Sequence, residues 1–351
     1  MDTCANPGCD QPGTSKCSAC KITPYCGPIC QTADWGHHKE ECPGHLRKVG
    51  MSNLEKALNF DREQNWPQSL RFAELAATKL KQLKDRPVDD FDRALHCKYN
   101  ALNFGGRHKE ALECAKEWYC LWLTKHTHPP AIDAGFAVIE SCIHNGEYFD
   151  ALLYARTTWE TITLSRDSHI PDDRREQFTA RGAIFLAQAT LALAQNGGIA
   201  VEGKEAAGKE VIALARRALA IDTQLFGIES EEVARDLSVL AELLDFFNDV
   251  DDDEVPRLYE QSNAIYARVQ GSLSPNLAAG EGCLGNAFYG RAKRAHVASD
   301  FDRVLVNLDL SLPHYREASR IYRAINHMDQ ADQAAQAVVQ MERLRLDLPP
   351  R

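Results

Sequence analysis

Residues 4–42 read CANPGCDQPGTSKCSACKITPYCGPICQTADWGHHKEEC and contain eight side chains of the kinds that bind zinc. They are Cys4, Cys9, Cys17, Cys20, Cys26, Cys30, His38 and Cys42, in the order C-x4-C-x7-C-x2-C-x5-C-x3-C-x7-H-x3-C. A structural zinc ion takes four thiolate or imidazole ligands in a tetrahedral shell. Four closely spaced ligand pairs therefore predict two closed zinc sites, with no coordination position left for a substrate.

The residues that surround these ligands resemble the MYND zinc finger. The matching pieces are Tyr25-Cys26, Cys30-Gln31, Asp34-Trp35, and His38-Lys39 ahead of Cys42. In that family the ligand pairs interleave as a cross-brace. The resemblance implies one zinc ion held by Cys4, Cys9, Cys26 and Cys30, and a second held by Cys17, Cys20, His38 and Cys42. It covers residues 4–42 and implies a small finger stabilised by two Zn²⁺ ions.

Two residues of this stretch that are not ligands are expected to bind a partner. In MYND fingers, peptides of the type Pro-x-Leu-x-Pro contact a glutamine and a tryptophan, which correspond by position to Gln31 and Trp35. A spacing of four residues puts both side chains on one face of a helix. An exposed indole suits stacking on proline, whereas a buried indole would pack between the two zinc sites. Both roles remain open for Trp35.

Three histidines lie near Cys42 and could complete the second site: His37, His38 and His45. A helix would place His38 and Cys42, four residues apart, on one face, while His37 would be rotated by about 100°. We therefore expect His38 to be the ligand. His45 follows Cys42 and is expected to be a solvated histidine at a helix end.

The charge of the chain argues against a nucleic-acid ligand. The whole sequence has 40 basic and 50 acidic residues, which give a net charge of −10. Within residues 1–48, five basic and five acidic residues cancel, and seven thiolates outweigh the charge of two Zn²⁺ ions. Non-specific binding to DNA depends on lysines and arginines that neutralise phosphates. A neutral to negative finger lacks that attraction.

The cysteines indicate the compartment. Thiols in a zinc shell stay reduced inside the cell, and the chain opens with polar residues instead of the apolar region of a signal peptide. We predict an intracellular protein of the cytoplasm or nucleus. The most apolar stretch, residues 183–194, is too short to span a bilayer, so no membrane association is expected. Five further cysteines are scattered singly and are expected to be buried apolar residues: Cys97, Cys114, Cys120, Cys142 and Cys283.

Beyond residue 50 the sequence is rich in Ala, Leu, Glu, Arg and Gln at helical spacing and contains a recurring pattern. An aromatic residue or histidine is followed by a small residue and leucine, and then by alanine. The copies begin at Trp66, His108 and Tyr148, so the spacing is 42 and then 40 residues. Such a period predicts a solenoid of helix pairs.

This pattern resembles the tetratricopeptide repeat (TPR), in which glycine closes the first helix and small residues let the second helix pack closely. Residues 218–241 look like the longer repeats of kinesin light chains. We expect six helix pairs and a capping helix over residues 328–346. The predicted fold is a zinc-stabilised finger at residues 1–45, a linker at 46–55 and an all-α TPR-like domain at 56–347.

The sequence contains no recognisable catalytic constellation. MYND-containing methyltransferases carry a SET domain, but this chain lacks its Asn-His-Ser-Cys signature and has no room for its sheet after Cys42. We therefore predict a non-enzymatic adapter, in which the finger binds a short proline-containing peptide and the solenoid groove binds a second protein. The alternatives are a regulatory subunit or SET-less relative of a MYND methyltransferase, or a factor associated with a ubiquitin ligase.

Overall fold

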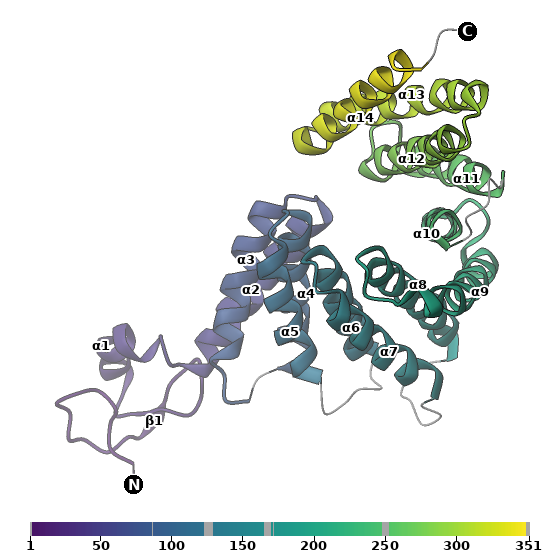
Figure 1. Ribbon diagram of the computed structural model, residues 1–351. Helices are drawn as coiled ribbons and strands as arrows, with labels where there is room; N and C mark the ends of the chain where they lie inside the picture. The colour runs from purple at the N-terminus through teal and green to yellow at the C-terminus, as the bar shows by residue number, and fades with distance from the viewer. Residues whose placement is uncertain are drawn as a thin grey trace. The chain divides into compact units, whose positions relative to one another are not determined.

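The computed structural model describes residues 2–85, 87–122, 129–164, 170, 172–247 and 253–348, which belong to two compact units, Met1–Tyr154 and Ala155–Arg351 (Figure 1). The first unit contains β1 (Ser15–Lys16), β2 (Pro24–Tyr25), α1 (Pro28–His38), α2 (Pro43–Arg62), α3 (Trp66–Lys81), α4 (Val88–Phe104), α5 (His108–Trp122), α6 (Pro129–His144) and the start of α7 (Tyr148–Leu164). The second contains the end of α7, then α8 (Asp172–Gln195), α9 (Val201–Phe226), α10 (Glu231–Phe247), α11 (Glu254–Val269), α12 (Pro275–Val297), α13 (Phe301–Ala324) and α14 (Met328–Leu346). No described helix is both long and apolar enough to cross a bilayer.

Within each unit, consecutive helices pack against one another, and alternate helices are also in contact. Thus α2 contacts α3 and α4, and α4 contacts α5 and α6; likewise α8 contacts α9 and α10, and α10 contacts α11 and α12. The first helices of successive pairs therefore lie side by side, which is the arrangement of TPR-like solenoids. Among the described helices, α2 packs with α3, α4 with α5, α8 with α9, α10 with α11 and α12 with α13 as consecutive pairs, and α14 packs on α13. The predicted all-α TPR-like fold is confirmed.

A residue in the left-handed conformation closes the first helix of each of the three sequence copies. Gln64, Gly106 and Gly146 stand two residues before a second helix and have φ angles of 55°, 72° and 77°. At each turn the following N–H donates to a carbonyl five residues back, as Arg107 does to Leu102, so that carbonyls at the helix end are satisfied. Glycine reaches this conformation without a clash at Cβ, which explains its place in the pattern.

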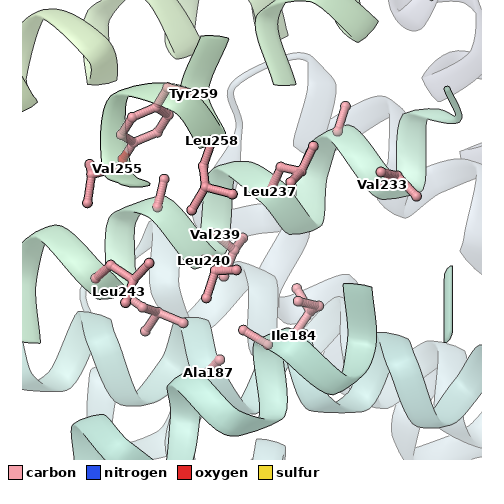
Figure 2. Close-up of a cluster of buried hydrophobic side chains, with 14 of the residues drawn as sticks. Ile184, Ala187, Val233, Leu237, Val239, Leu240, Leu243, Val255, Leu258 and Tyr259 are labelled. Atoms are coloured by element: carbon pink, nitrogen blue, oxygen red, sulfur yellow. The ribbon is translucent and has the colours of Figure 1, made fainter. Parts of the chain in front are cut away.

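Small and branched apolar side chains form the core of the second unit around α10 (Figure 2). Leu240 and Leu243 of α10 cluster with Ile184 of α8 and Leu258 of α11. Leu243 and Ile184 are 0% and 1% exposed, and each such side chain contributes about 1.5–3 kcal/mol when it leaves water. The buried Ala187 lets α8 and α10 approach closely. This cluster of buried apolar side chains determines which helices of the second unit pack against one another.

Helix α2 begins directly after the last predicted zinc ligand. Cys42 is its N-cap residue and Pro43 stands in its first turn. Leu46 and Leu54 are buried, so the apolar face of the helix starts within that turn. Residues 46–55, which we expected to form a linker, are therefore helical and belong to α2. Where the boundary between the finger and the repeats falls stays a prediction.

A buried charged cluster joins α9 to α10. Arg235 donates to Asp222 at 3.0 Å and to Asp236 at 2.9 Å, and both carboxyl groups are almost fully buried. One guanidinium thus faces two acids, and among the described groups Asp222 Oδ1 and Asp236 Oδ2 have no hydrogen-bond partner. Burial raises the pKa of Asp236 to about 7, although Arg235 opposes the shift. Glu232 and Tyr266 are the other titratable groups beside the cluster.

We predict that this cluster makes the second unit less stable as the pH rises. Folded Asp236 keeps its proton up to about pH 7, whereas an unfolded chain releases it at about pH 4. Between these values the folded state binds more protons, so the free energy of unfolding falls with rising pH, by at most about 1.4 kcal/mol per pH unit for one group. Asp236→Asn should flatten this slope, because an amide can donate to Asp222 at every pH.

Urea unfolding of the wild type and of Asp236→Asn at about pH 5 and about pH 7, followed by circular dichroism, measures the two slopes. The difference between the proteins isolates this cluster, since every other titrating group is common to both. Parallel pH profiles would show that Asp236 is ionised throughout.

Candidate metal centre

The finger is built from two short strands and one helix. β1 pairs antiparallel with β2, with Ser15 opposite Tyr25, and an isolated bridge joins Thr3 to Pro12. One ligand pair precedes β1, the next lies between β1 and β2, the third spans the start of α1 and the fourth spans its end. Such short elements bury little apolar surface, so the ligands themselves have to hold the finger together.

The structure gathers the eight predicted ligands into two groups: Cys4, Cys9, Cys26 and Cys30, and Cys17, Cys20, His38 and Cys42. Within each group all ligand atoms lie within 4.8 Å of one another. In the first group, Cys9 Sγ is 3.7 Å from Cys26 Sγ. In the second, Cys17 Sγ is 4.0 Å from Cys42 Sγ, and Cys20 Sγ is 3.6 Å from His38 Nε2.

These separations match the edges of a zinc tetrahedron. With Zn–S bonds of about 2.3 Å and Zn–N bonds of about 2.1 Å, tetrahedral angles place two sulfurs about 3.8 Å apart and a sulfur and a nitrogen about 3.6 Å apart. Both groups consist only of thiol and imidazole donors, the ligands that zinc prefers. The two clusters therefore fit two structural zinc sites, each with four ligands from the protein.

The thiols within each group lie in different electrostatic environments, because each group contains a cysteine with a lowered pKa and another with a raised pKa. Burial raises the pKa of Cys20, but backbone hydrogen bonds from Thr23 and Ile22 outweigh it and lower that pKa to about 6. At Cys26 the side chains of Cys30 and Cys9, together with burial, raise the pKa to about 12. Crowded sulfurs of this kind ionise together only with a cation among them. Zinc binding would therefore release protons and weaken at low pH.

The three histidines near Cys42 occupy different places. His38 contributes Nε2 to the second group, while His37 is exposed to solvent. The ring of His45 lies edge-on to Trp35, with 5.3 Å between ring centroids. His45 is therefore a packing partner of the tryptophan, and not the solvated residue that we expected. The expected helix through His38 and Cys42 is absent: α1 ends at His38, and Cys42 is the N-cap of α2. The assignment of His38 as a ligand agrees with its place in the second group and stays a prediction.

A buried hydrogen bond that sequence reasoning missed closes the core of the finger. Tyr25 is fully buried, and its hydroxyl donates to Asp34 Oδ2 at 2.6 Å. Burial and the nearby carboxylate raise the pKa of Tyr25 well above its usual value. The two residues lie on β2 and α1, so neither strand nor helix spacing could pair them. The only signal was that both belong to the pieces that resemble the MYND finger.

The two expected peptide contacts lie beside the second group. Gln31 Nε2 donates to Ser18 Oγ at 2.9 Å, next to the ligand Cys17. Trp35 is half-buried and packs against the cysteines, with its ring edge-on to His38 at 6.0 Å between centroids. The packing role of Trp35 is thus present in the structure, and part of its surface remains exposed. Peptide binding by both residues stays a prediction.

Comparison with known proteins agrees with this geometry. The family model of the MYND finger matches residues 4–42. This stretch is a MYND finger. A segment of 39 residues is 46% identical to Deformed epidermal autoregulatory factor 1 of Drosophila melanogaster, a match that covers 11% of this chain. The chain spans about 6% of the length of that relative, so the likeness is local to a small part of both proteins.

Solved structures that resemble the MYND-finger chain are helical repeat proteins. A P. anserina protein with nearly identical TPR-like repeats of the kinesin light chain type has a TM-score of 0.45 and 18% identity; the match covers 64% of this chain and 98% of that one. A Rap protein complexed with Competence and Sporulation Factor has a TM-score of 0.49 and 10% identity, covering 88% and 76%. The helix contacts within each unit, and not these distant matches, establish the TPR-like arrangement.

We predict two zinc ions per chain. Structural zinc contributes about 10–16 kcal/mol of apparent binding free energy in small fingers, so chelation should unfold the finger while the helical units persist. Cys26→Ser should empty the first site, whereas Cys120→Ser should leave both sites filled. Cys120 lies outside the finger and is exposed, not buried as we expected. Elemental analysis of protein purified without chelator measures the content. One zinc ion or none in the wild type would contradict the two-site geometry.

Replacing single histidines should show which of them binds the metal and which only lies nearby. We expect His38→Ala to remove one of the four donors of the second site, and His37→Ala to leave that site intact because its side chain is exposed. Cobalt(II) in place of zinc reports the number and type of ligands through its visible absorption. Equal changes in the cobalt spectrum of both variants would show that the wrong histidine has been assigned.

Proposed function

We propose that this chain is a non-enzymatic adapter, in which the MYND finger binds a short proline-containing peptide and the TPR-like helices bind a second protein. MYND fingers and TPR-like repeats are modules of protein interaction. The observation that carries the proposal is the combination of two complete ligand groups with a half-exposed tryptophan beside them. A complete tetrahedral shell stabilises a fold and offers no position to a reacting group. Recognition is then the function that the finger can perform.

The face of α1 that carries Gln31 and Trp35 has the chemistry to bind an extended peptide. Because Gln31 Nε2 already donates to Ser18, its Oε1 is left to accept a hydrogen bond from a peptide N–H. The exposed part of the Trp35 indole offers a flat apolar surface of the kind on which proline rings stack. Proline-containing peptides are already extended, so binding costs them little conformational entropy.

The helical units supply the second half of the adapter. In solenoids the first helices of successive pairs line an extended surface that takes up peptides or other proteins. Here α2, α4 and α6 form such a row in the first unit, and α8, α10 and α12 form one in the second. Thiolate ligands require a reducing compartment, so we place this adapter in the cytoplasm or the nucleus, with proteins and not nucleic acid or membrane as its partners.

We predict that Trp35→Ala and Gln31→Ala weaken binding of a Pro-x-Leu-x-Pro peptide without releasing zinc. Neither side chain belongs to a ligand group. Truncation of a tryptophan at the centre of an interface commonly costs about 2–4 kcal/mol, and the glutamine should cost less. Isothermal titration with the full-length protein measures the affinity, and elemental analysis of the same samples measures zinc. His37→Ala, on the same helix, is the matched control.

Two outcomes would contradict the role of this face. If both variants keep their zinc and bind the peptide as tightly as the wild type, the finger does not recognise proline-containing peptides through α1. If Trp35→Ala loses zinc, then packing against the cysteines is the function of that residue, and Gln31→Ala alone tests the peptide contact.

A further inference from the structure

The second unit has a cavity of 410 Å³ between helices α9 and α11. Leu219 lines it from α9, and Ala264 lines it from α11. Val233 and Leu237 of α10, both labelled in Figure 2, also line the cavity and are almost fully buried, so they form its floor. Its volume lies in the range of protein sites that hold small ligands, about 300–1,000 Å³. The cavity can therefore take up an apolar group of another molecule.

Apolar surface continues from the cavity onto the connection between α9 and α10. Ile228 lines the cavity from this connection and is 71% exposed. Leu225 and Phe226, at the end of α9, are exposed as well. Contiguous exposed apolar surface commonly marks a site of protein interaction. A partner of the cavity would thus find further apolar contacts at its mouth.

This surface differs from the row of first helices that we assign to the second protein partner. In that row α10 contacts α8 and α12. The cavity instead opens between α9 and α11, which are the second helices of two successive pairs. Helix α10 contributes only buried side chains to it. A ligand of the cavity would therefore be additional to both partners of the proposed adapter.

The charged residues of the lining are already paired. Glu229 and Arg268 both line the cavity, and they form an ion pair with each other. Arg216 of α9 donates to both carboxylate oxygens of Glu254 of α11, at 3.0 and 3.1 Å, and so bridges the two walls. Glu254 and Arg268 stand near opposite ends of α11, about 21 Å apart at a rise of 1.5 Å per residue. The surface between these two ion pairs suits an uncharged, apolar ligand.

The helical walls also offer few polar groups to an extended peptide. The Thr223 hydroxyl donates to the Leu219 carbonyl at 2.6 Å, so Gln261 is the one polar side chain of the described lining without a partner. The peptide groups of α9 and α11 are bonded within their own helices. An extended peptide would therefore bury N–H and C=O groups that find no partner, which is unfavourable. A helix satisfies these groups itself.

We propose that the surface between α9 and α11 binds an amphipathic helix of a partner protein, whose apolar face places one large side chain in the cavity. Ala264 is exposed on α11, and its small side chain leaves the space for that group open. Ile228 would cover the adjoining turn of the bound helix. The length between the two ion pairs accommodates about four helical turns. Binding of a helix through the apolar residues of one face is a recurring mode of recognition.

A displayed library of alanine-based helices of about 16 residues, randomised along one face and selected against the full-length zinc-loaded protein, tests the proposal. The recovered peptides are synthesised and titrated into the wild type and four variants. Ala264→Leu fills the cavity, and Ile228→Asp places a charge at its mouth. Ala213→Leu and Val297→Asp are their matched controls, because both residues are exposed in the second unit and neither lines the cavity.

We expect a class of peptides with a large apolar residue on the randomised face, whose affinity falls at least about tenfold in both cavity variants. The two controls, and also Trp35→Ala in the finger, should bind this class as the wild type does. Circular dichroism should show the same helical content in all the proteins. A proline in the middle of a recovered peptide should abolish its binding, because proline breaks a helix.

Three results would overturn the proposal. The first is that no such class is recovered, or that its members bind the cavity variants and the controls equally well. The second is that a central proline leaves the affinity unchanged, which would show that the peptide binds in an extended form. The third is a wild type that dimerises in sedimentation while Ala264→Leu stays monomeric, because a second copy of this chain would then occupy the surface.

Discussion

The structure of the N-terminal part depends on the coordination geometry of its second ligand group. Cys42 is both the last ligand of that group and the N-cap of α2, so the position of the metal site fixes where the first repeat helix begins. Gly44 then lies against the carbonyl group of Ala19, which stands between the ligands Cys17 and Cys20 in the sequence. A finger whose small core consists mainly of its ligand cysteines, with Tyr25 and Trp35, is in this way joined to a helical body with a larger apolar core. Metal binding and packing of the first helices are therefore coupled through a few consecutive residues.

The helical body is held by a different physical rule, which the pairs beginning at α2, α4 and α6 repeat. A left-handed residue closes one helix, and small side chains let the next helix approach, as Ala73 and Ala76 do on α3. Several of the polar groups inside this apolar frame are paired with one another. Trp118 and Trp122, for example, both donate their indole N–H to Asp92 at 2.6 Å. The cluster of Arg235 with two carboxyl groups leaves two carboxylate oxygens without a hydrogen-bond partner, and burial raises the pKa of Asp236 there, so its contribution to stability depends on pH.

The local features of this chain could be predicted from its sequence, and the long-range ones could not. Ligand order predicted the MYND finger because donor pairs are close in the chain, and the glycine and alanine pattern predicted helix pairs because it repeats. The hydrogen bond from Tyr25 to Asp34 joins two elements whose spacing in the sequence carries no signal. Residues 46–55, which we expected to form a linker, are helical for a related reason: Leu46 and Leu54 continue a helical face that only the packing of α2 on α3 and α4 makes visible.

The central claim is that metal coordination in the finger supports the start of the first repeat helix. Hydrogen–deuterium exchange of the full-length protein, with zinc and after chelation, tests it peptide by peptide. The account predicts that chelation removes protection from residues 4–42 and from the first turns of α2, while α8 to α14 keep theirs. Unchanged protection of the first turns of α2 after the metal is removed would show that the start of this helix does not depend on zinc, and would contradict the account.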